Sequence, residues 1–186
     1  MAEHTPSQQS GNPEEPSRAE RLREKNLFEE LIRIRDDQRE KAKNAVWKIK
    51  GKDLPWEINR HGKMQWYMHP CIEDVALQSQ FFFSQEIAPG SKSGRQQCQG
   101  NIVFYVIEGS GFTIVDGIKH PWTANDVINL PIREEGLTYQ HFNTDPEKRV
   151  LMVGSEPNLI GPLGVDKGSG FEELEPCPEW LKEQGR

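Results

Sequence analysis

The chain of 186 residues carries a formal net charge of −6, and 34% of its residues are hydrophobic. An acidic chain without a basic patch is not expected to bind nucleic acid, and no apolar run is long enough to cross a membrane. The sequence does not begin with an apolar segment of the secretory type, and its three cysteines lack metal-site spacing. We therefore expect a single cytoplasmic domain with polar extensions and reduced thiols.

The first part of the chain predicts a disordered tail, residues 1–16, and then one amphipathic helix, residues 17–46. The tail is rich in Ser, Gln, Glu, Pro and Gly and shows no apolar periodicity. Ser17 and Glu20 have the spacing of a capping box, in which each side chain accepts a hydrogen bond from the other residue's backbone N–H. Residues 17–46 contain no Gly or Pro, and strong helix formers dominate.

One face of this expected helix is apolar. Leu27, Leu31 and Ile34 recur at helical spacing, while charged residues fill the opposite face. The helix would be roughly 40 Å long at 1.5 Å per residue, longer than a small barrel is wide. We therefore expect part of the apolar face to contact another subunit or a partner protein.

Three further segments follow the helix. Residues 47–70 hold three of the five tryptophans without a clear period, and we interpret them as an aromatic-rich arm packed on the outside of the domain. Residues 71–156 are the expected barrel, and they begin with an alternating strand from Val75 to Ile87. Residues 157–186 contain several prolines and glycines, which favour an extended, irregular tail that wraps the barrel.

The central part of the chain, residues 89–143, alternates short apolar runs with turn residues. The run from Ile102 to Ile107 is followed by glycines at 109 and 111, and Asp116-Gly117 and Asn125-Asp126 mark two further turns. Such spacing is typical of antiparallel hairpins rather than of parallel strands joined by helices. Several hairpins at close spacing indicate a sandwich or barrel.

These residues also carry a resemblance to the cupins. The segment from Val106 to Gly117 is similar to the middle of the first cupin motif, and Gln140-His141-Phe142-Asn143 is similar to the end of the second. Within the cupins, the sequence of these two motifs resembles that of gentisate-type aromatic ring-cleaving dioxygenases and their single-domain relatives. The resemblance implies an all-β fold, a single cupin barrel of the double-stranded β-helix or jelly-roll type, with a long helix before it and an irregular tail after it.

The metal-ligand positions of the cupin motifs are altered in this sequence. In the register of the resemblance, the two histidines of the first motif fall on Gln96 and Cys98, and its glutamate falls on Ile102. The histidine of the second motif falls on Tyr139. The resemblance thus implies that the usual metal site is degenerate. We expect no cofactor, although iron remains the metal implied if Gln96, Cys98, Tyr139 and His141 form a non-standard site.

Strand parity predicts which side chains share the interior of the barrel. Side chains separated by an even number of residues point to one face of a regular strand. This rule places six residues in the lumen: Gln96, Cys98, Ile102, Phe104, Tyr139 and His141. Such a lumen combines apolar walls with a few polar groups, which is typical of small-molecule sites, so we expect it to bind a small aromatic acid or phenol.

Three functions remain open from the sequence. The first is an accessory or ligand-binding cupin without metal, forming a homodimer or a hetero-oligomer with a catalytic cupin subunit. The second is a ring-cleaving dioxygenase with a non-standard metal site. The third is a metal-free isomerase or lyase that uses Tyr139 and His141 as an acid–base pair. Each residue also has a plain structural role available, since Cys98 can be a small buried hydrophobe and the polar groups can bond one another.

Overall fold

The computed structural model describes residues 16–23, 25–75, 79–158 and 171–186. The chain divides into two compact units, Met1–Lys43 and Asn44–Arg186, which are described separately. Within the described ranges, no helix is long and apolar enough to cross a membrane. The expected disordered tail, residues 1–16, lies outside the described residues except for Pro16.

Residues 16–23 and 25–43 of the first unit form two helices, α1 (Arg18–Arg23) and α2 (Leu27–Lys43), so the prediction of one long helix over residues 17–46 is wrong. The capping box is confirmed: Ser17 N–H donates to Glu20 Oε2 over 2.8 Å, and Glu20 N–H donates to Ser17 Oγ over 3.3 Å. The second helix starts because Asn26 provides its own cap, accepting a hydrogen bond from Glu29 N–H.

The apolar stripe of α2 is not covered by any described residue of its own unit. Leu27, Phe28, Leu31 and Ile34 are all exposed, and α2 contains no buried residue. Its opposite face carries ion pairs such as Arg33 with Glu30 at 2.8 Å. Exposed ion pairs of this kind typically stabilise a protein by less than about 1 kcal/mol, so they do not explain why the apolar residues of α2 share one face.

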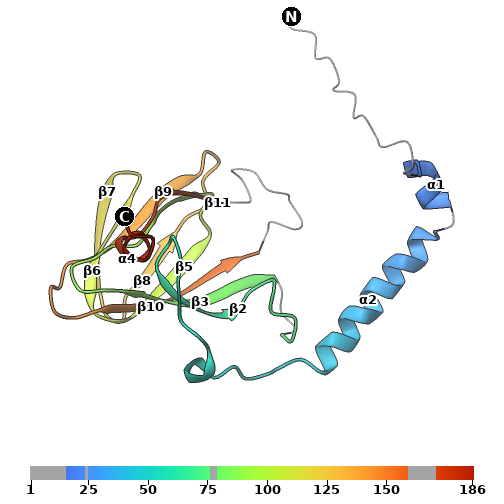
Figure 1. Ribbon diagram of the computed structural model, residues 1–186, viewed down its shortest axis with the longest axis horizontal. Coiled ribbons are helices and arrows are strands. Elements are labelled where there is room, and N and C mark those ends of the chain that lie inside the picture. Colours follow the sequence, from blue (N-terminus) through green and yellow to red (C-terminus); the bar gives the residue numbers. More distant parts are fainter. Residues whose placement is uncertain (1–15, 24, 76–78, 159–170) are drawn as a thin grey trace, which may run out of the picture. The chain divides into compact units, whose positions relative to one another are not determined.

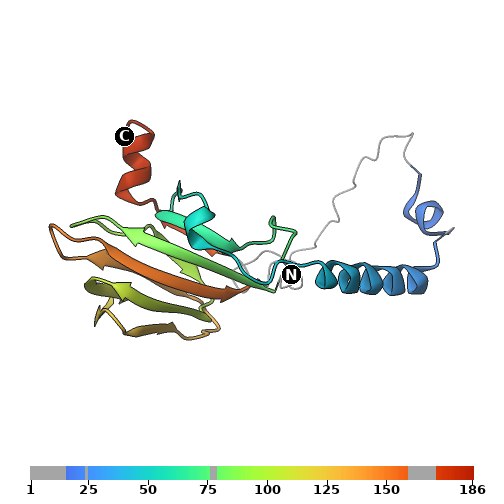
Figure 2. The ribbon, with the colours of Figure 1, turned by 90° about the horizontal axis from the view of Figure 1, so that it is seen from below.

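The second unit is built from two antiparallel sheets (Figures 1 and 2). The six-stranded sheet has the order β1-β2-β3-β10-β5-β8, and the five-stranded sheet has the order β11-β4-β9-β6-β7. The elements are η1 (Gly51–Asp53), β1 (Glu57–Ile58), β2 (Lys63–Met68), β3 (Gln80–Ile87), β4 (Arg95–Cys98), β5 (Ile102–Glu108), β6 (Ser110–Val115), β7 (Ile118–Thr123), β8 (Val127–Leu130), β9 (Leu137–Asn143), β10 (Val150–Pro157), β11 (Phe171–Glu175) and α4 (Pro178–Glu183).

The hairpin predicted at Asp116-Gly117 is present. Strands β6 and β7 pair in the register Val115↔Ile118, so the loop between them has two residues. Both loop residues have positive φ, 49° at Asp116 and 82° at Gly117. Such angles are required by the tight turns that match the twist of paired strands, and Asp-Gly adopts them readily.

The sheets extend beyond the predicted barrel at both ends. Strands β1 and β2 lie in the segment expected to be an arm, and β2 pairs with β3 along the six-stranded sheet. The tail is not irregular throughout, because β11 joins the edge of the five-stranded sheet and α4 follows it. Pro178 stands in the first turn of α4, where a missing N–H costs nothing, so proline here starts a helix rather than preventing one.

The inner faces of the two sheets meet in one apolar core. Its central members come from both sheets: Phe83 and Met152 from one, Trp122 and Leu137 from the other, with Phe104 completely buried between them. Strand β3 forms the second part of the predicted strand from Val75 to Ile87, but Val75 itself lies in a bend, and residues 76–78 lie outside the described residues. The core positions the polar groups described next.

Candidate functional site in the barrel lumen

The structure places all six residues selected by strand parity on the inner side of the barrel. Five of them are almost fully buried, and Gln96 is partly exposed at the rim: Cys98, Ile102, Phe104, Tyr139 and His141 are each at most 6% exposed. The rings of Phe104, Tyr139 and His141 contact one another, with centroids 4.6 to 6.0 Å apart. Three of the six side chains thus form an aromatic cluster inside the barrel, and the polar groups of Tyr139 and His141 belong to it.

Tyr139 lies at the centre of this region. Its hydroxyl donates to Gln96 Oε1 over 2.7 Å and lies 3.4 Å from His61 Nε2. Burial, with a smaller contribution from the negative charge of Glu156, raises the pKa of Tyr139 well above its usual value. The side chain is therefore a neutral hydrogen-bond donor at physiological pH, not a phenolate.

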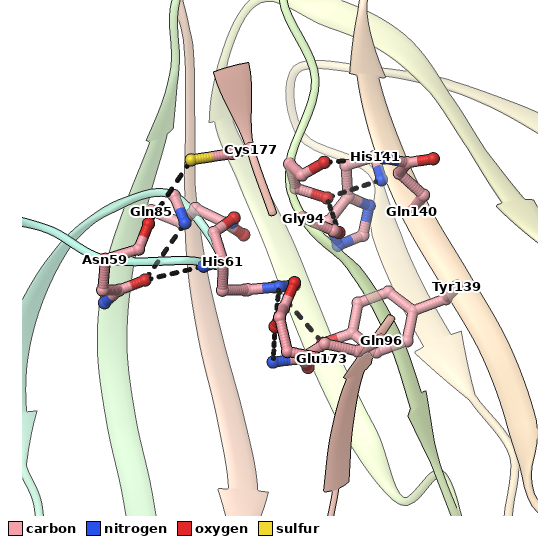
Figure 3. A network of polar contacts seen from close by, with 12 residues as sticks. Asn59, His61, Gln85, Gly94, Gln96, Tyr139, Gln140, His141, Glu173 and Cys177 are labelled. Atoms are coloured by element: carbon pink, nitrogen blue, oxygen red, sulfur yellow. Dashed lines mark hydrogen bonds and ion pairs between the residues drawn. The ribbon is translucent and has the colours of Figure 1, made fainter. Parts of the chain in front are cut away.

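Two residues that the sequence did not suggest complete the polar cluster, His61 and Glu173 (Figure 3). Gln96 Nε2 donates to Glu173 Oε2 over 3.0 Å, and His61 Nδ1 lies 3.6 Å from the same oxygen. Glu173 reaches the lumen because β11 pairs with β4 in the register Glu173↔Gln96, which puts the two side chains on one face.

The sequence could have indicated the position of His61 but not that of Glu173. The loop between β1 and β2 holds His61, and Asn59 Oδ1 accepts hydrogen bonds from the backbone N–H groups of His61 and Gly62. An Asn placed before His-Gly is a turn signal that could have located this loop. Glu173 has no comparable signal, since it contacts Gln96 from 77 residues away.

His141 is fixed by one ring nitrogen and leaves the other without a partner. Thr113 Oγ1 accepts a hydrogen bond from Trp122 Nε1 at 2.8 Å and also forms a hydrogen bond with His141 Nδ1 at 2.7 Å. The other ring nitrogen, Nε2, is buried and has no hydrogen-bond partner among the described residues. Burial, assisted by His61, lowers the pKa of His141 to about 3, so the ring is neutral at pH 7.

The far side of the lumen holds a thiol and a carboxyl group. Burial raises the pKa of Cys98 to about 11. Glu156 shares the inner face of β10 with Gly154, whose backbone approaches the rings of Phe83 and Phe104. Burial raises the pKa of Glu156 to about 7, so this carboxyl is half-protonated near neutral pH.

The donor set of the lumen does not fit an iron site. Cys98 and Tyr139 carry their protons in the metal-free protein, so a metal ion would have to displace both protons to be ligated by them. The hydroxyl of Tyr139 is already bonded to the Gln96 carbonyl oxygen, the other weak ligand of the set. Among the described residues, no group of three or more His, Cys, Asp or Glu side chains is arranged to hold a metal ion.

A separate cavity of about 460 Å³ lies on the surface rather than in the lumen. It is lined by Gln97, Asp116 and residues 133–138, and it contains none of the six predicted residues. Arg133 and Asp116 form an ion pair of 3.3 Å beside it. This surface hollow therefore does not correspond to the binding site predicted from the sequence.

Comparison with known proteins gives a fold and one relative. No known protein family matches the chain at the level of a family profile. A 5-aminosalicylate 1,2-dioxygenase from Comamonas is 23% identical over 105 residues, and the match covers 56% of this chain but only 27% of the dioxygenase. The chain thus spans about a quarter of that relative's length.

Solved structures resemble the barrel at low sequence identity. The polyketide cyclase RemF from Streptomyces resistomycificus matches 60% of this chain and 79% of its own, with a TM-score of 0.51 and 13% identity. A Cupin 2 conserved barrel domain protein from Salinispora arenicola matches 59% and 85%, with a TM-score of 0.46 and 20% identity. Likeness at such identity concerns the fold alone. The two antiparallel sheets have the cupin architecture, and the resemblance seen in the sequence is confirmed at that level.

Proposed function

We propose that the barrel binds a small phenol or aromatic acid at the polar end of its lumen, without using a metal. One observation carries the proposal. The residue at the position of a cupin ligand histidine, Tyr139, is instead held as a neutral donor to Gln96 Oε1, with His61 Nε2 at 3.4 Å. The neighbouring His141 presents a buried nitrogen that has no partner. A site that offers hydrogen-bonding groups in place of metal ligands suits a hydroxyl or carboxylate on an aromatic ring.

The walls of the lumen support an aromatic ligand. Ile102 and Phe104 provide apolar surface, and Phe104 already packs edge-on against His141. The dioxygenase relative is named for a ring that carries hydroxyl, amino and carboxylate groups, which is the class of compound proposed here. Its match covers too little of that enzyme to transfer the reaction itself.

The two enzymatic alternatives receive less support. A ring-cleaving dioxygenase would need a set of metal ligands, but two members of this set, the Tyr139 hydroxyl and the Gln96 carbonyl oxygen, are already bonded to each other. For an isomerase or lyase, the predicted acid–base pair has no direct hydrogen bond among the described contacts, since Tyr139 bonds Gln96 and His141 bonds Thr113. A ligand-binding or accessory cupin is therefore the function we favour.

Calorimetry against a panel of hydroxybenzoates and hydroquinones tests this function. We expect binding that persists in the presence of a metal chelator, because no metal takes part. The variant His141→Ala should bind roughly tenfold more weakly, the effect of losing one buried hydrogen bond of about 1.4 kcal/mol. The matched control is His120→Ala, which alters an exposed histidine on β7 and should leave binding unchanged.

Two outcomes would contradict the proposal. The first is the absence of binding by any member of the panel at millimolar concentration. The second is binding that disappears with the chelator and returns with iron, which would favour the non-standard metal site formed by Gln96, Cys98, Tyr139 and His141.

We also propose that the chain associates, either with a second copy or with a catalytic cupin subunit. The exposed stripe of α2 supports this, because Phe28 and Leu31 are more than 60% exposed and large exposed apolar patches mark interaction sites. Sedimentation velocity at micromolar concentration should show a dimer, and the double variant Phe28→Ser/Leu31→Ser should be a monomer. A wild-type monomer would count against self-association and leave the heteromeric partner to be sought.

A further inference from the structure

The structure points to Glu173 as a built-in occupant of the ligand site. We propose that its carboxylate holds the carboxylate subsite of the lumen, and that an aromatic acid binds by displacing it. The inference rests on the proposed function, and it adds the ligand's recognition group and the step that opens the site. The subsite is formed by Gln96, His61 and the backbone at Gly94.

The contacts of Glu173 are those of a carboxylate ligand, but they are incomplete. One oxygen, Oε2, accepts from Gln96 Nε2 at 3.0 Å and lies 3.6 Å from His61 Nδ1. The other oxygen, Oε1, is buried and has no hydrogen-bond partner in the part of the chain that the structure describes. The Glu173 side chain is only 9% exposed. An ionised carboxylate has room for about four hydrogen bonds, and burying it with fewer is unfavourable. A ligand carboxylate that makes more hydrogen bonds in this recess could therefore replace the Glu173 carboxylate.

The recess for the carboxylate depends on a glycine. A methyl group on Gly94 would overlap both Glu173 Oε1 and the carbonyl oxygen of Arg60. Gly94 is also fixed in place, because its N–H donates to the His61 carbonyl oxygen over 2.8 Å. The space that Glu173 fills is thus part of the barrel framework and would remain if the side chain left.

Glu173 can leave without disturbing the core. Strand β11 is the outermost strand of its sheet, and its pairing with β4 becomes irregular between Glu173 and Glu175. The contacts of Glu175 with Lys92 and Arg95 involve partly exposed side chains, which contribute little. Beyond β11 the chain is anchored again at Cys177, whose N–H donates to the Arg60 carbonyl oxygen over 2.8 Å.

Displacement would expose groups suited to an aromatic acid. Gln96 Nε2 would donate to the ligand's carboxylate in place of Glu173. The ring of Tyr139, whose hydroxyl also bonds Gln96, would be available to pack against an attached aromatic ring. A neutral phenol lacks the group that competes with Glu173, so it should gain much less from removal of this side chain.

Calorimetry with benzoate and phenol on the full chain tests the inference. A site that is open one-tenth of the time binds about tenfold more weakly than an open one, so Glu173→Ala should bind benzoate about tenfold or more tightly than wild type. Phenol affinity should change by less than about threefold. The control is Glu172→Ala, because Glu172 is exposed on the opposite face of the same strand. Glu173→Gln, which keeps the shape, should give a smaller gain for benzoate than the alanine variant.

A second measurement on the wild type separates displacement from a change in folding. Hydrogen–deuterium exchange of residues 171–175 should accelerate when benzoate binds and should not change with phenol. If phenol binds all variants and benzoate gains nothing in Glu173→Ala, the inference is wrong while the proposed function stands. If neither compound binds wild type or variant, both are wrong.

Discussion

The carboxyl group of Glu156 should make the stability of the barrel depend on pH, and Glu156→Gln should remove that dependence. Burial raises its pKa from 4.5 to about 7 in the folded protein. The native state therefore holds a proton that the unfolded chain releases between those two values. The contribution of Glu156 to the free energy of unfolding is therefore most favourable below pH 4.5, becomes less favourable as the pH rises toward 7, and is constant above it. A neutral glutamine does not ionise, so it should not show this pH-dependent decrease.

The size of the effect follows from the two values. The difference between 4.5 and about 7 corresponds to about 3 kcal/mol, at about 1.4 kcal/mol for each tenfold change in the ionisation equilibrium. Glu156 is partly exposed as a residue, so this is an upper bound. We expect Glu156→Gln to raise the free energy of unfolding by up to about 3 kcal/mol at pH 8 and by about 1 kcal/mol at pH 5.

Urea denaturation of wild type and variant at pH 5 and pH 8 measures both quantities. The control is Glu147→Gln, which alters an exposed glutamate in the loop before β10 and should give equal stability changes at the two pH values. The reasoning is refuted if Glu156→Gln changes the free energy of unfolding equally at pH 5 and pH 8, or if it destabilises the protein at pH 8.

Two further outcomes are expected. Asn143→Ala should lower the free energy of unfolding, measured by urea denaturation, by about 2 to 4 kcal/mol. The reason is that the buried amide donates to the carbonyl oxygens of Ile87, Ala88 and Lys148 and accepts from Asp145 N–H. A decrease of less than about 0.5 kcal/mol would contradict this. A thiol reagent should modify one cysteine per native chain rapidly, since Cys71 is exposed while Cys98 and Cys177 are buried. Mass spectrometry of wild type and Cys71→Ser checks this, and rapid labelling of Cys98 in the native chain would contradict it.

Local pattern was sufficient to place much of the lumen. Parity along a strand depends only on the backbone pleat, so Phe104 and His141 could be assigned to the inner face without knowledge of the fold. The hairpin at Asp116-Gly117 is equally local, because its turn needs only residues that tolerate positive φ. The role of these residues in binding remains a prediction.

The residues that were missed depend on distant pairing or on competition between local signals. Glu173 enters the lumen only because β11 pairs with β4, and nothing near Glu173 in the sequence specifies that register. Glu156 is inward by parity, but a carboxyl group in an apolar lumen contradicts the usual pattern of a strand. In the first unit, the capping preference of Asn26 prevailed over a composition that favours one continuous helix.

The pairing of β11 with β4 also has a consequence for the order of folding. Gln96 meets Tyr139 across 43 residues of chain, but it meets Glu173 across 77. Closing a longer loop is entropically less favourable, and long-range strand pairs form slowly. Strand β11 should therefore dock after β4 and β9 have paired. The lumen would first assemble as a hydrated cleft, and its water would be expelled only when the last strand arrives.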